Sequence, residues 1–151
     1  MQRTLAASIV LAFFLFAPLF ASAQEAKVRE TVDNLLKLLG TNDAAGLADY
    51  FTNDAILIVA RQREGKWTNT VETTKRWLER MRSNRGASPF EERLSNVEVT
   101  IDNGELAYVR ADFEIVRDGK VMTYGVDLFT LLRVGDAWKI AAISYTNLLK
   151  E

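Results

Sequence analysis

Charged residues stand at both ends of a predicted β-hairpin, residues 110–127, with the sequence RADFEIVRDGKVMTYGVD. Asp118-Gly119 in its middle is typical of a two-residue type I′ turn, which fixes the register of the two strands. That register places Arg110 directly opposite Asp127. An arginine can stabilise a developing negative charge, and a buried carboxyl group can transfer a proton, so the pair is a candidate catalytic or ligand-binding element.

The same reasoning extends the pair into a row across three strands. If Gly135-Asp136 forms the next two-residue turn, Asp127 also faces Ser144 on the last strand. Asp112 and Tyr108 then flank the row on the same face. A one-residue error in either turn would move the row to the opposite face, because side chains alternate along a strand.

The face that carries this row is otherwise mainly apolar. An ion pair is costly to bury unless both groups are satisfied, so its presence there needs a reason. One reason is a structural ion pair, and another is a ligand site in which apolar walls surround a few polar groups. The residues alone leave both open. The apolar neighbours are Val97, Val99, Ile101, Phe129, Leu131, Trp138, Ile140 and Ala142.

Four long segments of alternating apolar residues follow Pro89 and predict a meander of antiparallel strands. Short turn signals separate the segments, and the second half of the mature chain is therefore expected to be mostly sheet. The predicted strand ranges are 91–102, 105–117, 120–134 and 137–148.

The segment before the meander has helical spacing. Residues 25–39 predict an amphipathic helix, and a shorter helix capped by Asn42 or Asp43 follows. The apolar run 55–60 predicts one strand covered on both faces. Asn69 with Glu72 three residues later predicts a capping box that opens a third helix, which ends near residue 83. The chain is thus predicted to be α+β.

Composition limits the available chemistry. The 151 residues contain no histidine and no cysteine. These absences exclude Ser-His-Asp and Cys-His nucleophiles, disulfides and every histidine-ligated metal site within one chain. No calcium-loop pattern is present, and we expect no metal and no other cofactor. The formal net charge of −1 argues against a general nucleic-acid binder.

The first residues have the layout of a secretory signal peptide, with Arg3, an apolar run over residues 5–20 and an Ala21-Ser22-Ala23 cleavage site. We expect residues 1–23 to be removed and residues 24–151 to form a single secreted or periplasmic domain without membrane contact. An uncleaved membrane anchor is the alternative. The apolar run falls short of the roughly 18 residues that suggest a spanning helix.

Two segments resemble a known superfamily. Residues 38–59, LLGTNDAAGLADYFTNDAILIV, and residues 129–144, FTLLRVGDAWKIAAIS, are similar to the nuclear transport factor 2-like superfamily, particularly its SnoaL-like bacterial members. The resemblance spans nearly all of residues 25–148. It implies a cone-shaped, curved, mostly antiparallel sheet with three N-terminal helices packed on its concave face. It also implies a homodimer formed through the outer face of the sheet.

The superfamily includes ketosteroid isomerases, to which the resemblance is partial. Asp127 falls where those enzymes have a protonated aspartic acid in the oxyanion hole. Val59 stands at the position of their catalytic base and Leu35 at that of their hydrogen-bonding tyrosine. The resemblance therefore does not imply isomerase activity.

The superfamily also includes limonene-epoxide-hydrolase-like enzymes. Arg110-Ala111-Asp112 resembles their Arg-x-Asp pair, which polarises and protonates the epoxide. Tyr145 stands where their second aspartate activates water, and the predicted register points it to the other face. Two of the three parts of that mechanism are present.

Three functions follow from these patterns. The first is an exported protein that binds a small, largely apolar molecule in the cone. The second is a lyase, isomerase or hydrolase whose catalytic set is Asp127 with Arg110 and Asp112. The third is a homodimeric interaction module with a filled cone. Arg61 and Arg63 either lie at the pocket mouth or are solvated edge charges. The predicted ligand contacts are Tyr108, Ser144, Phe129, Trp138, Trp67 and Val59.

Overall fold

The computed structural model describes residues 6–84 and 88–150. Two helices, two strands and a third helix come first, and an uninterrupted run of four strands follows in the described residues. The elements are α1 (Ala6–Gly40), α2 (Ala44–Ala48), β1 (Phe51–Arg63), β2 (Lys66–Thr73), α3 (Thr74–Ser83), β3 (Glu91–Asp102), β4 (Leu106–Arg117), β5 (Lys120–Val134) and β6 (Ala137–Leu149).

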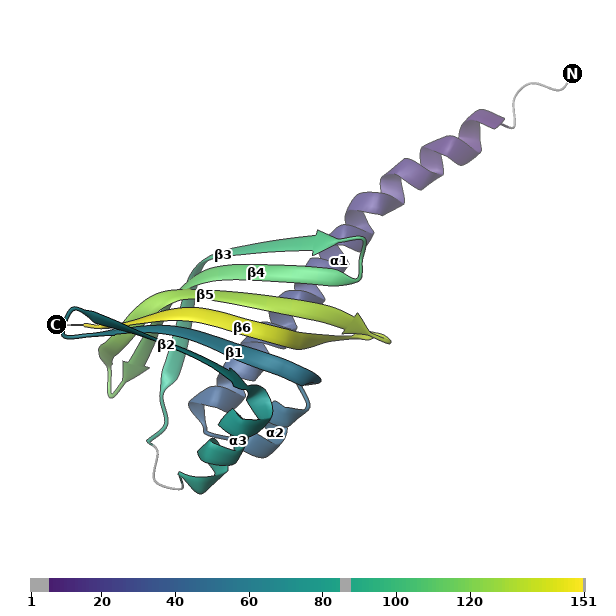
Figure 1. Cartoon of the computed structure of the whole chain (residues 1–151). Helices are drawn as coiled ribbons and strands as arrows, with labels where there is room; N and C mark the ends of the chain where they lie inside the picture. The colour runs from purple at the N-terminus through teal and green to yellow at the C-terminus, as the bar shows by residue number, and fades with distance from the viewer. Residues whose placement is uncertain (1–5, 85–87, 151) are drawn as a thin grey trace, which may run out of the picture.

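The strands form one six-stranded curved sheet in the order β2-β1-β6-β5-β4-β3 (Figure 1). Neighbouring strands are antiparallel except β1 and β6, which are parallel. The helices lie on one side of the sheet, which we call the concave face, and the other side is the outer face. The predicted α+β fold, with a curved, mostly antiparallel sheet and N-terminal helices, is confirmed.

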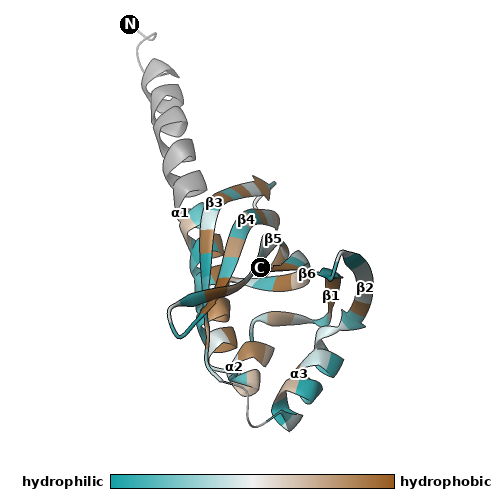
Figure 2. Cartoon of the chain, turned by 90° about the vertical axis from the view of Figure 1, so that its left-hand side faces the viewer, coloured by the Kyte–Doolittle hydropathy of each residue, from teal (hydrophilic) through white to brown (hydrophobic). Residues whose placement is uncertain are grey.

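The second half of α1 fills the concave side. Val28, Val32 and Leu35 recur every three to four residues and are fully buried, as expected for the apolar stripe of an amphipathic helix. They share one core with Val109 and Phe129 of the sheet. Along β3 and β4 apolar and polar residues alternate (Figure 2), so the strands turn their apolar sides to the helices.

The meander of β3 to β6 matches its prediction within a residue at almost every boundary. The Asp118-Gly119 and Gly135-Asp136 turns have the predicted two-residue length. The loop between β3 and β4 is one residue longer than predicted, because Asp102 pairs with Leu106.

β-Bulges change the register of the central strands. One inserts Met122 into β5 and another inserts Ala141 into β6, and β3 is interrupted between Ser95 and Glu98. Each bulge adds one residue to one strand of a pair, so every pair beyond it is shifted by one position. The turns were therefore predicted correctly, and the pairing in the middle of the sheet was not.

Residues 66–73 form a strand and not the start of a helix. β2 pairs antiparallel with β1, and Thr73 caps α3 by accepting a hydrogen bond of 3.3 Å from the Arg76 N–H. The predicted capping box at Asn69 and Glu72 is wrong. Threonine, valine and tryptophan in this segment favour a strand, and pairing with β1 gives the backbone groups partners.

β1 is longer than its prediction and is covered on one face only. Leu57 is buried on the concave face, whereas its neighbour Ile58 is 39% exposed on the outer face. The prediction of a strand covered on both faces is therefore wrong.

α1 runs without interruption through the predicted cleavage site after Ala23. Residues 1–5 of the predicted signal peptide lie outside the described residues, and cleavage stays a prediction. In residues 6–84 and 88–150, no helix is both long and apolar enough to cross a membrane.

Candidate functional site

A cavity of about 290 Å³ lies between the helices and the concave face of the sheet. Its walls come from α1, α3 and every strand except β2, and they are mostly apolar with a few polar groups, as in small-molecule sites. The lining residues are Leu35, Leu36, Leu39, Asn42, Leu57, Arg61, Trp77, Met81, Phe90, Glu92, Phe113, Ile115, Asp127, Phe129, Ile143, Tyr145 and Asn147.

Asp127 is held in this cavity by the sheet and is only 3% exposed. The shifted register pairs it with Ala111 on β4 and with Tyr145 on β6. Gly125, two residues earlier, allows β6 to approach closely, because a Cβ there would lie 2.0 Å from the carbonyl oxygen of Thr146. The backbone therefore fixes the carboxyl group on the concave side.

Asp127 and Glu92 form a pair of interacting carboxyl groups. Burial, the charge of Glu92 and a hydrogen bond donated by Asp127 to Glu92 raise the pKa of Asp127 to about 9. Burial also raises the pKa of Glu92, although the same hydrogen bond opposes this shift. At neutral pH the pair therefore holds a proton on Asp127.

The second carboxyl oxygen of Asp127, Oδ2, is buried and has no hydrogen-bond partner among the described residues. Asp127 shares a proton with Glu92, so the two carboxyl groups together have more acceptor positions than donors. A donor on a bound molecule beside this pair would be stabilised.

Tyr145 and Arg61 also belong to the polar part of the lining. The Tyr145 ring packs edge-on against Phe113, with 6.4 Å between the ring centroids. Burial raises the pKa of the Tyr145 hydroxyl, and the positive charge of Arg61 opposes this shift, so the hydroxyl stays neutral at neutral pH. Arg61 is itself exposed and lies at the edge of the cavity. Arg63 instead donates a 3.0 Å hydrogen bond to Asn147 Oδ1.

Arg110 and Asp112 lie on the outer face, so the predicted pairing of Arg110 with Asp127 is wrong. The bulge in β5 pairs Arg110 with Leu128 instead. Arg110 and Asp112 form an ion pair with 2.7 Å between Nη2 and Oδ1, and their side chains are 38% and 33% exposed. Asn96 donates a 2.7 Å hydrogen bond to Asp112 Oδ2. The predicted catalytic set is therefore divided between the two faces.

Three predicted ligand contacts also lie on the outer face. Ser144 pairs with Leu128, and Tyr108 pairs with Thr130, both away from the helices. Trp67, on β2, is 52% exposed. The predictions of Ser144 and Tyr108 as cavity residues are wrong because they depended on a register without bulges, and that of Trp67 is wrong because β2 leaves this side chain exposed.

The remaining predicted contacts lie on the concave side. Phe129 lines the cavity, as predicted. Val59 is buried beside Tyr145 but is not part of the lining. Trp138 is buried at another place and takes part in a separate surface groove.

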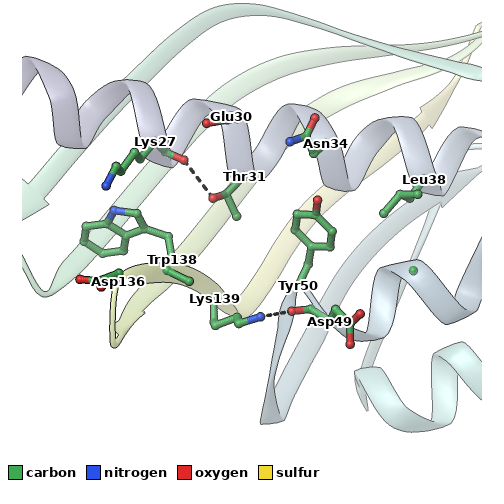
Figure 3. Close-up of a pocket in the computed structure, with 12 residues that line it drawn as sticks. Lys27, Glu30, Thr31, Asn34, Leu38, Asp49, Tyr50, Asp136, Trp138 and Lys139 are labelled. Atoms are coloured by element: carbon green, nitrogen blue, oxygen red, sulfur yellow. Dashed lines mark hydrogen bonds between the residues drawn. The ribbon is translucent and has the colours of Figure 1, made fainter.

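That groove has a volume of about 570 Å³ and lies between α1, α2 and the turn from β5 to β6 (Figure 3). Trp138 lies at the same end as Lys27 of α1 (Figure 3). Lys139 donates a hydrogen bond to the carbonyl of Asp49. The other lining side chains include Glu30 and several polar groups that face solvent. Mixed, solvated charges of this kind are typical of an ordinary protein surface.

Sequence reasoning missed Glu92 and mis-assigned Tyr145. Glu92 alternates with Leu94, which faces the core, so the period of β3 could have placed it on the concave face. Tyr145 was expected on the opposite face from Asp127 because no signal for the bulge at Ala141 was recognised. The two residues that contact Asp127 most directly thus depended on irregularities of the strands.

Within residues 6–84 and 88–150, no three histidine, cysteine, aspartate or glutamate side chains gather into a group that could hold a metal ion.

The sequence matches a protein family described as "Putative lumazine-binding" over residues 23–146. The chain belongs to this family. The match includes all six strands up to the middle of β6, and so almost the whole cavity lies within the lumazine-binding-like domain. A search of curated proteins finds no match to the sequence.

Solved structures share the fold of this lumazine-binding-like domain. A protein of unknown function from Mycobacterium tuberculosis has a TM-score of 0.69 and 14% identity, covering 87% of this chain and 75% of that chain. A "Putative Scytalone Dehydratase" from Novosphingobium aromaticivorans has a TM-score of 0.66 and 16% identity, covering 84% and 85%. An ntf2-like protein with a cystatin-like fold from the same species has a TM-score of 0.63 and 17% identity, covering 91% and 88%. The predicted nuclear transport factor 2-like fold is confirmed.

Proposed function

We propose that this protein binds a small, largely apolar molecule in the cavity beside Asp127. The observation that carries the proposal is a mostly apolar cavity of about 290 Å³ whose lining includes the buried carboxyl group of Asp127 and that of Glu92. Apolar walls with a few polar groups are typical of small-molecule sites. The presence of this cavity also argues against the third predicted function, an interaction module whose cone is filled by side chains.

The test is to fill the cavity. Ile115→Trp adds a large ring to its wall, and lumazine and 2-naphthol are suitable probes because both are flat, small and bicyclic. Isothermal titration calorimetry should show binding of at least one probe to the unmodified protein and a loss of at least about tenfold in Ile115→Trp, since apolar ligands lose affinity when their pocket volume disappears.

Val134→Trp is the matched control, because it makes a similar change at a residue that is 54% exposed on β5. It should bind as the unmodified protein does. Circular dichroism would establish that both variants are folded. Equal affinities in the two variants, or no binding of either probe to the unmodified protein, would contradict the proposal.

A second candidate function is proton transfer, favoured by the raised pKa of Asp127 in a cavity. The set with Arg110 and Asp112 has no geometric basis, so Glu92 is the group left to act with Asp127. A small apolar probe is 5-nitrobenzisoxazole, whose C3 proton goes to a base while the N–O bond breaks to give a cyanophenolate. At about pH 9.5, where Asp127 is ionised and can accept the proton, its opening should slow about 10²-fold or more in Asp127→Asn and remain unchanged in Asp112→Asn. Equal rates in both variants would count against this candidate.

The proposal includes a second copy of the chain on the outer face. Val71, Ile58 and Leu128 lie in one cross-strand row with Arg110 and Ser144, and the three apolar side chains are 68%, 39% and 49% exposed. Contiguous exposed apolar side chains mark interaction surfaces. A two-fold arrangement would bury the same patch on both copies and let the charged groups beside it pair across the interface.

Export is also part of the proposal. It rests on the Ala21-Ser22-Ala23 cleavage pattern after an apolar run. The intact mass of the protein recovered from its source would show removal of residues 1–23, and an uncleaved chain would contradict export by this route.

A further inference from the structure

We propose that the ligand of this cavity is a small organic cation, a protonated amine on an apolar or aromatic body. The inference rests on the proposed ligand-binding function and adds the charge and the donor chemistry of the ligand. Three features of the cavity carry it: the acceptors of the carboxyl pair, the distribution of basic groups and the aromatic lining.

The carboxyl pair presents acceptors to the cavity. Asp127 and Glu92 both line the cavity and share a proton, so together they have more acceptor positions than donors. A ligand carbonyl would bring a further acceptor to this point. An N–H group brings a donor.

The pair has no basic partner of its own. Among the ion pairs of the described residues, neither Asp127 nor Glu92 has a cationic partner. Arg61 is exposed, so water screens much of its charge. The nearby Arg80 is already bound to Glu72 at 2.6 Å. The charged groups of the cavity lining are thus two acids, Asp127 and Glu92, and one exposed base, Arg61, which favours a positive ligand.

Aromatic side chains surround the rest of the cavity. Ring faces attract cations, most strongly when both are removed from water. Trp77 is held edge-on by Phe51, with 6.1 Å between ring centroids, and Tyr145 is held in the same way by Phe113. The aromatic lining is Trp77, Phe90, Phe113, Phe129 and Tyr145. These rings suit both the apolar body of the ligand and its charged end.

Binding of an amine should release a proton. The empty pair holds a proton on Asp127 at neutral pH, and an ammonium group beside it favours the ionised carboxylate. The balanced step joins the ammonium ion to the protonated pair and yields the ion pair plus one proton in solution. Other titratable groups near Asp127 are Glu92, Tyr145 and the more distant Arg61 and Glu72. The affinity should therefore rise roughly tenfold per pH unit from pH 6 to pH 8.

Three naphthalene probes that differ mainly in charge test the inference: 1-naphthylmethylamine, 1-naphthalenemethanol and 1-naphthoate. Calorimetry at pH 7.5 should give the amine at least about tenfold higher affinity than the alcohol, with naphthoate weakest, because hydrogen bonds to charged groups are the stronger ones. Titrations in two buffers of different ionisation enthalpy should show about one proton released with the amine and none with the alcohol.

Asp127→Asn keeps the shape of the side chain and removes its ability to ionise. It should lower the affinity for the amine to near that for the alcohol and leave the alcohol unchanged. Asp112→Asn on the outer face should change neither the affinity for the amine nor that for the alcohol.

Tighter binding of the alcohol or of naphthoate than of the amine would overturn the cation inference and leave the proposed ligand binding intact. Tight naphthoate binding would also identify Arg61 as the anchor. Binding of none of the three probes would overturn both. Amine binding that Asp127→Asn does not weaken would show that the cation binds elsewhere, and would also overturn the inference.

Discussion

The two faces of the central sheet carry aspartates in opposite chemical states. Asp127 is almost fully buried on the concave face, and burial together with Glu92 raises its pKa to about 9. Asp112, on the neighbouring strand but on the outer face, is partly exposed, and hydrogen bonds with Asn96 and then Arg110 lower its pKa. The face on which a carboxyl group lies, and not its residue type, decides whether it keeps its proton.

A one-residue step in β4 separates the two environments, since Ala111 pairs with Asp127 and Asp112 is the next residue. Without the inserted Met122 in β5, the turn at Asp118-Gly119 would bring Arg110 to Asp127. The carboxyl group would then meet a permanent cation and stay ionised. The bulge therefore decides whether the cavity contains an acid or a salt bridge.

The largest expected effect comes from two neighbours on β5 that face opposite ways. Phe129 is 2% exposed and Leu128 is 49% exposed. Phe129→Ala should lower the free energy of unfolding by about 3–5 kcal/mol through loss of burial and a new void. Leu128→Ala should lower it by about 0.5 kcal/mol or less in the monomer, as for exposed positions. Urea denaturation at low protein concentration measures both.

Similar losses in the two variants would break the comparison, because they would mean that the outer face is as well packed as the concave one. Leu131→Ala, at another fully buried position of β5, serves as a second concave variant and should resemble Phe129→Ala.

The next largest effect is a difference between Asp127 and Asp112 in how the free energy of unfolding depends on pH. The folded pKa of Asp127 lies above its unfolded value of 3.8, so its contribution to stability is complete below about pH 3.8 and is lost progressively until about pH 9. Over this window the free energy of unfolding should fall by up to about 1.4 kcal/mol per pH unit. Asp127→Asn should reduce this slope, leaving the part due to Glu92, whose pKa is also raised, and should make the protein more stable than the unmodified chain at pH 8.

The contribution of Asp112 to the free energy of unfolding should change with pH in the opposite direction. Its folded pKa is lowered, so its contribution is present above the unfolded value of 3.8 and is lost as the pH falls below it. The free energy of unfolding of Asp112→Asn should therefore have the same pH slope as that of the unmodified protein between pH 5 and pH 9. Urea denaturation of both variants at pH 5, 7 and 9 provides the measurement, and a pH slope in Asp127→Asn as steep as in the unmodified protein would contradict the assignment of the proton.

The sequence predicts those structural features that follow a regular residue pattern, such as alternation along a strand. It does not predict features that interrupt such a pattern, such as bulges. The boundaries of β3 to β6 and two of the turns followed from alternation and from turn residues such as Asp118-Gly119. The inserted Met122 and Ala141 have no comparable signal in the sequence. The packing of neighbouring strands, and not a local residue pattern, determines where such a bulge forms. Asp127 and Phe129 were placed in the cavity correctly, whereas the predicted partners of Asp127 were not.

The smallest expected effect concerns the association of two chains through the outer face. Leu128→Lys places a charge in the centre of the exposed apolar row and should weaken dimerisation at least about tenfold, since burial of an unpaired charge costs more than its packing returns. Sedimentation velocity over a range of concentrations measures this. Leu149→Lys, at a residue that is 47% exposed at the end of β6, is the matched control and should behave as the unmodified chain. A protein that sediments as a monomer before any substitution would show that another partner, or solvent alone, covers the outer face. The two faces would then still differ in burial, because the concave face contains a buried acid and the outer face an exposed apolar surface.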